Sequence, residues 1–102
     1  MAWQRVCPSA QLSEGQAIEV VLDENVIAIF RSEGVLSALD GMCAHQGGPL
    51  ARGHVANGRV TCPWHGWQYE LQNGNNAVTC KPMQRTYPVN EIDGWIHIEL
   101  AK

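Results

Sequence analysis

Two short cysteine/histidine pairs at the two ends of one segment constrain this chain more than any other feature. The segment CAHQGGPLARGHVANGRVTCPWH opens with Cys43-x-His45 and closes with Cys62-x-x-His65. At spacings of two and three residues, one tight turn brings both side chains of a pair to one point. Thiolate and imidazole are ligands of zinc and, in some iron–sulfur proteins, of iron. The sequence therefore predicts two loop tips that meet around a metal centre.

The residues beside the two pairs favour such loops. Gly47 follows the first pair closely and Gly66 follows the second, and glycine suits tight turns in which backbone amides point inward. Between the pairs, Asn57-Gly58 separates two short segments, which is typical of a type I′ hairpin. We expect this hairpin to fold the chain back so that the two loop tips come together.

Turn signals recur at short intervals along the chain and favour an all-β domain of about eight to ten short strands, closed or sandwiched. The segments between them alternate, so that Ile96, Ile98 and Leu100, for example, are predicted to share one face of the last strand. No window shows a convincing helical period, and residues 9–14 have room for one helical turn at most. The predicted turns lie at 23–25, 32–34, Asn57-Gly58, Asn73-Gly74 and Asp93-Gly94.

Length and charge narrow the class of protein. We expect the 102 residues to form one domain. The net charge is −3 and Lys and Arg do not cluster, so we expect no nucleic-acid partner. The longest apolar run, residues 26–30, is too short to cross a bilayer. The first residues have no apolar stretch of the kind that signal peptides carry, so we expect a cytoplasmic protein without a membrane partner.

Two kinds of metal centre suit four such ligands. One is a closed, tetrahedral zinc site in a binding module without a redox role. The other is a 2Fe–2S cluster, with each pair on its own iron or with both cysteines on one iron and both histidines on the other. Zinc sites usually begin with two cysteines separated by two to four residues, so the opening Cys43-x-His45 is unusual for zinc.

Two cysteines and two histidines remain outside the pairs. We expect Cys7 and Cys80 to be ordinary thiols, with a disulfide between them as the alternative. His54 and His97 are predicted to be surface histidines on strands.

The motifs that include the pairs resemble the Rieske iron–sulfur domain. CAHQGGPL and CPWHGWQYEL resemble its two cluster-binding loops, and CKPMQRTYPV resembles its later proline loop and the strand after it. The resemblance implies a Rieske-like fold of short antiparallel strands over the whole chain, 1–102. A small cluster-binding subdomain, about residues 41–83, would be inserted in a β-barrel or β-sandwich base formed by residues 1–40 and 84–102.

The same resemblance implies one 2Fe–2S cluster per chain. Cys43 and Cys62 would bind one iron, and His45 and His65 would bind the other through Nδ1. Further residues are implied to surround the cluster, among them a tyrosine that hydrogen-bonds a cysteine sulfur and a loop proline. They are Gly47, Trp64, Gly66, Tyr69 and Pro82.

This ligand set predicts the class of reduction potential. Two thiolates neutralise the charge of two ferric ions and two sulfides, whereas four thiolates leave a dianion, and a neutral centre accepts an electron more readily. Rieske centres accordingly begin near about −150 mV, against about −400 mV for four-cysteine plant-type ferredoxins. High-potential relatives carry an inter-loop disulfide where this chain has Gly48 and Trp64, and a serine where it has Trp67. We therefore expect a potential of roughly −150 mV.

The resemblance implies an electron-transfer protein without catalytic residues of its own. It points to the small ferredoxins of bacterial aromatic-ring oxygenase systems, which pass electrons from a flavin-dependent or other reductase to an oxygenase. The alternative is the small subunit of a nitrite-reductase-like complex. A standalone oxygenase also needs a mononuclear iron on two histidines and a carboxylate, and about 100 residues leave no room for a substrate domain.

Overall fold

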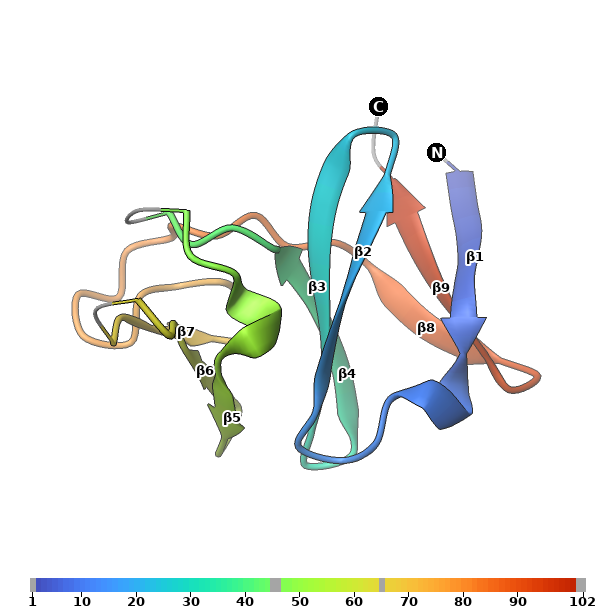
Figure 1. Ribbon diagram of the computed structural model, residues 1–102, viewed down its shortest axis with the longest axis horizontal. Helices are drawn as coiled ribbons and strands as arrows, with labels where there is room; N and C mark the ends of the chain where they lie inside the picture. The colour runs from blue at the N-terminus through green and yellow to red at the C-terminus, as the bar shows by residue number, and fades with distance from the viewer. Residues whose placement is uncertain (1, 45–46, 65, 101–102) are drawn as a thin grey trace.

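The computed structural model describes residues 2–44, 47–64 and 66–100, which form short strands and two 3₁₀ helices (Figure 1). This confirms the all-β prediction, and η1 is the single helical turn expected near residue 9. No helix in these ranges is long and apolar enough to cross a membrane. The elements are β1 (Ala2–Pro8), η1 (Ser9–Gln11), β2 (Ala17–Leu22), β3 (Asn25–Ser32), β4 (Val35–Asp40), η2 (Leu50–Arg52), β5 (His54–Ala56), β6 (Arg59–Thr61), β7 (Gln68–Glu70), β8 (Val89–Ile92) and β9 (Trp95–Leu100).

The strands pair in three antiparallel sheets, with strand orders β1-β9-β8, β2-β3-β4 and β5-β6-β7. Figure 1 shows the first two sheets next to each other, and the small third sheet at the opposite end of the molecule from β1, β8 and β9. The loops that follow β4, β6 and β7 lie at this same end (Figure 1). The chain therefore has a larger base and a smaller loop-rich end.

Strand β3 separates two hydrophobic cores. Ile27 and Ile29 pack with Ile96 and Ile98 in the core between the first two sheets. The residues that alternate with them, represented by Phe30, pack on the other face with residues of the third sheet. Because β3 is covered on both faces, its sequence is a continuous apolar run rather than an alternating pattern.

Two hairpin turns form where Asn-Gly and Asp-Gly dipeptides predict them. Asn57-Gly58 and Asp93-Gly94 have positive φ at both positions, and each connects two paired strands, β5 to β6 and β8 to β9, as expected for type I′ hairpins. The turn at Asn73-Gly74 forms as well, and residues 75–77 return antiparallel beside β7 through a bridge between Tyr69 and Asn76. Only Gly74 of this pair has positive φ, and its role depends on a distant contact described below.

One ion pair joins the first two sheets and predicts a small dependence of stability on pH. Arg31 Nη2 lies 2.9 Å from Glu91 Oε2, and this hydrogen bond holds the pKa of Glu91 below its ordinary value. The stabilisation is present above the ordinary pKa of glutamate and is lost as pH falls through the lowered one. Because Glu91 is exposed, we expect Glu91→Gln to cost less than about 1 kcal/mol at pH 7.

Urea unfolding at pH 7 and pH 3 measures this effect, with Glu19→Gln, at an exposed position of β2, as the control. The loss caused by Glu91→Gln should be smaller at pH 3 than at pH 7. An equal loss at both pH values would show that the Glu91 side chain acts by packing instead of by charge.

Candidate metal centre

Cys43 and Cys62 come from different loops and meet in the core of the loop-rich end. Cys43 follows β4 and Cys62 follows β6, and the two residues are 3% and 1% exposed within one hydrophobic cluster. Burial raises the pKa of the Cys62 thiol, the Trp64 N–H lowers it, and the neighbouring Cys43 thiol raises it further. The structure thus brings together the two predicted thiolate ligands.

The two predicted histidine ligands, His45 and His65, lie outside the described residues. Within the described ranges, no group of three or more His, Cys, Asp and Glu side chains gathers in a way that could hold a metal ion.

Loop 1, residues 41–49, is shaped by its own backbone hydrogen bonds. The Cys43 N–H donates to the Gly48 carbonyl at 2.8 Å, and the Gly47 N–H donates to the Cys43 carbonyl at 2.7 Å. Gly47 has a φ of +79°, a left-handed conformation that favours glycine. These bonds hold Cys43 beside Gly47 and Gly48.

Loop 2, residues 62–67, is closed in a similar way. The Cys62 N–H donates to the Trp67 carbonyl at 2.7 Å, and Gly66 has a φ of +74°. The Trp64 N–H points back to the Cys62 sulfur at 3.4 Å. Loop 2 therefore presents a backbone donor to one of the predicted ligand atoms.

Gly48 is the point at which the two loops touch. A Cβ atom on Gly48 would lie 2.8 Å from Cys62 Sγ and 2.9 Å from Trp64 Cγ, which is too close for any side chain. Two buried thiols from different loops, one of them with a backbone N–H directed at its sulfur, fit a group held by thiolates between the loops.

Gly48→Ala is accordingly expected to displace the Cys62 sulfur and to destabilise the protein by about 1–3 kcal/mol. The visible spectrum of the protein reports the displacement, and thermal unfolding reports the stability. Gly15→Ala is the matched control, because Gly15 has a φ of +78° with nothing within 4 Å of the added methyl. Gly15→Ala should lower stability without changing the visible spectrum. An unchanged spectrum in Gly48→Ala would contradict the proposed displacement of the Cys62 sulfur.

Tyr69 contacts the other sulfur. Its hydroxyl oxygen lies 3.1 Å from Cys43 Sγ, as predicted for a tyrosine that hydrogen-bonds a cysteine sulfur. Tyr69 lies on β7 and is completely buried, so the core fixes the position of its hydroxyl. Once Cys43 is deprotonated, the hydroxyl is the donor of this contact.

Gln84 is the residue at this site that no sequence signal indicated. It lies in the segment that resembles the proline loop and the strand after it, is 5% exposed, and its side chain bonds backbone groups of Asp40, Met42 and Ala44. In an irregular segment, no sequence pattern distinguishes a glutamine with a buried side chain from one with a side chain in solvent. Of the other residues predicted nearby, Trp64 is 48% exposed and Pro82 is exposed, two residues before Gln84.

The remaining cysteines and histidines lie outside the site. Cys7 is a free thiol buried in the core of the base, and Cys80 is a free, exposed thiol, so the alternative of a disulfide between them is wrong. His54 is exposed on β5, and His97 is partly buried on β9.

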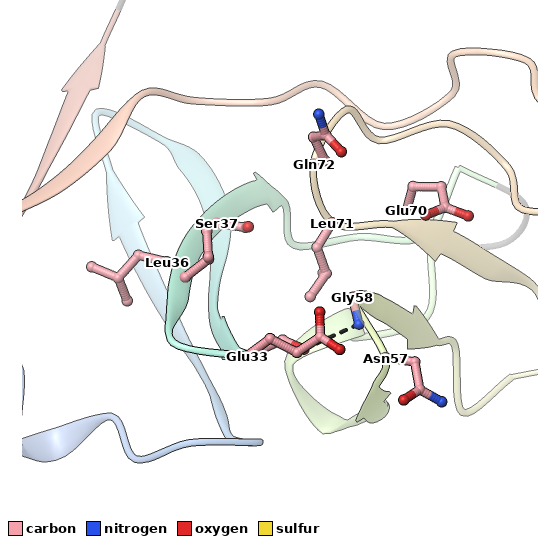
Figure 2. A pocket seen from close by; sticks show the side chains of 10 residues that line it. Glu33, Leu36, Ser37, Asn57, Gly58, Glu70, Leu71 and Gln72 are labelled. Carbon is pink, nitrogen blue, oxygen red and sulfur yellow. Dashed lines mark hydrogen bonds between the residues drawn. The ribbon is translucent and has the colours of Figure 1, made fainter.

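A groove of about 530 Å³ lies between the base and the small sheet (Figure 2). The turn after β3, represented by Glu33, forms one side, and the β5–β6 turn and Leu71 form the other. The Gly58 N–H donates to Ser32 Oγ at 3.1 Å across it. Neither Cys43 nor Cys62 lines this groove, which lies at the seam between the two parts of the molecule.

The chain matches the model of one protein family, the Rieske [2Fe-2S] domain, over residues 2–91. This match decides between the two kinds of metal centre in favour of a 2Fe–2S cluster. The chain is 28% identical over 102 residues to the anthranilate 1,2-dioxygenase ferredoxin subunit of Burkholderia cepacia, covering 97% of this chain and 93% of that one. Several longer curated relatives also match, and this chain spans only 12% to 31% of their length.

Solved structures with the same fold cover nearly the whole chain. The ferredoxin of Sphingomonas yanoikuyae B1 superimposes with a TM-score of 0.87 and 26% identity, covering 98% of this chain and 100% of that one. A Mycobacterium tuberculosis chain assigned as an NADH-dependent nitrite reductase small subunit gives a TM-score of 0.89 at 23% identity, covering 99% and 97%. The second likeness concerns the fold alone.

Proposed function

The chain belongs to the Rieske [2Fe-2S] domain family, and from that premise we propose that it is a one-electron carrier between a reductase and an oxygenase-type enzyme. The observation that carries the proposal is the likeness to a dioxygenase ferredoxin subunit over nearly all of both chains. The donor is a flavin-dependent or other reductase, and the acceptor is an oxygenase. The chain itself contributes no catalytic residue, and its proposed location is the cytoplasm.

The proposed cluster ligands are Cys43 and Cys62 on one iron and His45 and His65 on the other. The adjacency of the two buried thiols supports the first pair. When bound, the cluster stores one electron. The proposed cluster-binding subdomain, about residues 41–83, includes the third sheet and both loops, and the pairing of β5, β6 and β7 in a sheet of their own supports that division.

Two hydrogen-bond donors of this chain bear on the reduction potential of the proposed cluster. Tyr69 and the Trp64 N–H direct polar hydrogens at the two sulfurs, and donors to ligand sulfurs favour the reduced state.

Large apolar side chains remain exposed on the loops of this end, with exposures of 57% for Met42, 48% for Trp64 and 87% for Val78. Exposed apolar groups of this kind suit transient contact with a partner protein.

Stopped-flow spectroscopy with the isolated holoprotein tests the proposal. The protein should be red-brown, contain two irons per chain, and be bleached by a flavin reductase with its nicotinamide donor. Mixing the reduced protein with a resting ring-hydroxylating oxygenase should restore the colour rapidly. A reduced protein that no oxygenase reoxidises faster than buffer would overturn the carrier role.

The alternative is a small subunit of a nitrite-reductase-like complex, which the likeness of fold to the M. tuberculosis chain favours. Affinity purification from the native cell separates the two. Stable co-purification with a sirohaem-containing protein would support the subunit, whereas a carrier should be recovered without such a protein.

A further inference from the structure

Gln84 holds the backbone of loop 1 on both sides of Cys43. Its Oε1 accepts the Ala44 N–H at 2.6 Å. Its Nε2 donates to the carbonyl oxygens of Asp40 and Met42, each at 3.0 Å. Gln84 is 5% exposed and the three bonds are partly buried, so the loss of a partner is costly.

Gln84 is itself held in place. Its N–H donates to the Gly74 carbonyl at 3.0 Å, and a Cβ atom on Gly74 would lie only 2.1 Å from the Gln84 carbonyl oxygen. Only glycine allows this approach. Two residues further on, Thr86 pairs with Leu39 at the end of β4. The Gln84 side chain therefore reaches loop 1 from a fixed backbone.

The contact between Cys43 and Tyr69 depends on where loop 1 lies. Tyr69 is completely buried on β7, so its hydroxyl does not follow movements of loop 1. The sulfur of Cys43 belongs to loop 1 and lies 3.1 Å from that hydroxyl. A displacement of loop 1 away from β7 would lengthen this contact and weaken the hydrogen bond.

We propose that Gln84 is a positioning residue for the cluster, which keeps the Cys43 sulfur within hydrogen-bond distance of the Tyr69 hydroxyl. The inference rests on the proposed function, since it takes Cys43 as a ligand. A hydrogen bond to a ligand sulfur stabilises the reduced state. Gln84 thus raises the reduction potential without contacting the cluster.

A double-mutant cycle on the holoprotein tests this. Gln84→Met keeps the length of the side chain and removes its polar atoms, and Tyr69→Phe removes the hydroxyl. At a fixed ambient potential, each single variant should have a tenfold lower ratio of reduced to oxidised protein, which is about 59 mV for one electron. The double variant should match Tyr69→Phe alone, since Gln84 acts through that contact. Gln72→Met, at an exposed glutamine, is the control and should titrate as the wild type.

Two results would overturn the proposal: a wild-type midpoint in Gln84→Met, or a full additional loss when it is combined with Tyr69→Phe. If Gln84→Met does not assemble, residue-resolved hydrogen exchange on the wild-type holoprotein decides. The Ala44 amide should exchange slowly although Ala44 is exposed, and rapid exchange would refute the contact. A colourless wild type would instead refute the proposed cluster site, so the two failures are distinguishable.

Discussion

Cys62→Ala is expected to abolish cluster binding, with iron and labile sulfide falling below about a tenth of the wild-type content and the visible absorption disappearing. Cys62 is completely buried beside the other proposed thiolate ligand, and no other cysteine of the described structure lies in this hydrophobic cluster to replace it. An alanine supplies no ligand atom, and an iron with one thiolate is not held. Iron and sulfide analysis, together with the absorption spectrum, measures the result.

The matched control is Cys80→Ala, at the exposed thiol outside the site. This variant should keep the full cluster and the wild-type spectrum. Full iron content in Cys62→Ala would show that the ligands lie elsewhere, and loss of the cluster in Cys80→Ala would give this exposed thiol a role that its position does not explain.

The reduction potential of the wild type is expected near the bottom of the Rieske range, roughly −150 mV. The backbone of Gly48 lies directly against the Trp64 side chain, at the two positions where high-potential relatives carry the inter-loop disulfide. Glycine and tryptophan cannot form that bond. At the position of the serine of those relatives, Trp67 supplies no hydroxyl to a sulfide. With less stabilisation of the reduced state, the potential stays low.

An anaerobic redox titration followed by electron paramagnetic resonance measures the midpoint. A value above about +100 mV would contradict the interpretation of the loops, because it lies about 250 mV away, or about four decades in the one-electron equilibrium. A potential close to −150 mV would also be consistent with reduction by a flavin reductase.

The hairpin turns of this fold were predictable from the residues of the turns themselves. Asn57-Gly58 predicts its hairpin because positive φ at two successive residues is a property of those residues alone. The approach of the two loops that carry Cys43 and Cys62 was also predictable, because the hairpin between them folds the chain back. The fold class followed from the same spacing of turns along the chain.

Contacts between distant segments were not predictable. The composition of Asn73-Gly74 predicts a turn, but it does not predict that the Gln84 carbonyl packs against Gly74 and leaves no room for a side chain there. Likewise, Gln84 bonds backbone groups some 40 positions earlier in the chain, and backbone groups have no residue signature. A single sequence contains no pattern for contacts of this kind.

The double coverage of β3 has a consequence for protein engineering. Ala28 and Phe30 form one wall of the core beneath the two thiols, yet they belong to the strand whose other face, with Ile27 and Ile29, closes the base. A fragment of residues 41–83 would lack that wall and expose its apolar underside to water. The loop-rich end therefore cannot be grafted onto another scaffold by itself. The graft must include strand β3, which also forms part of the core of the base.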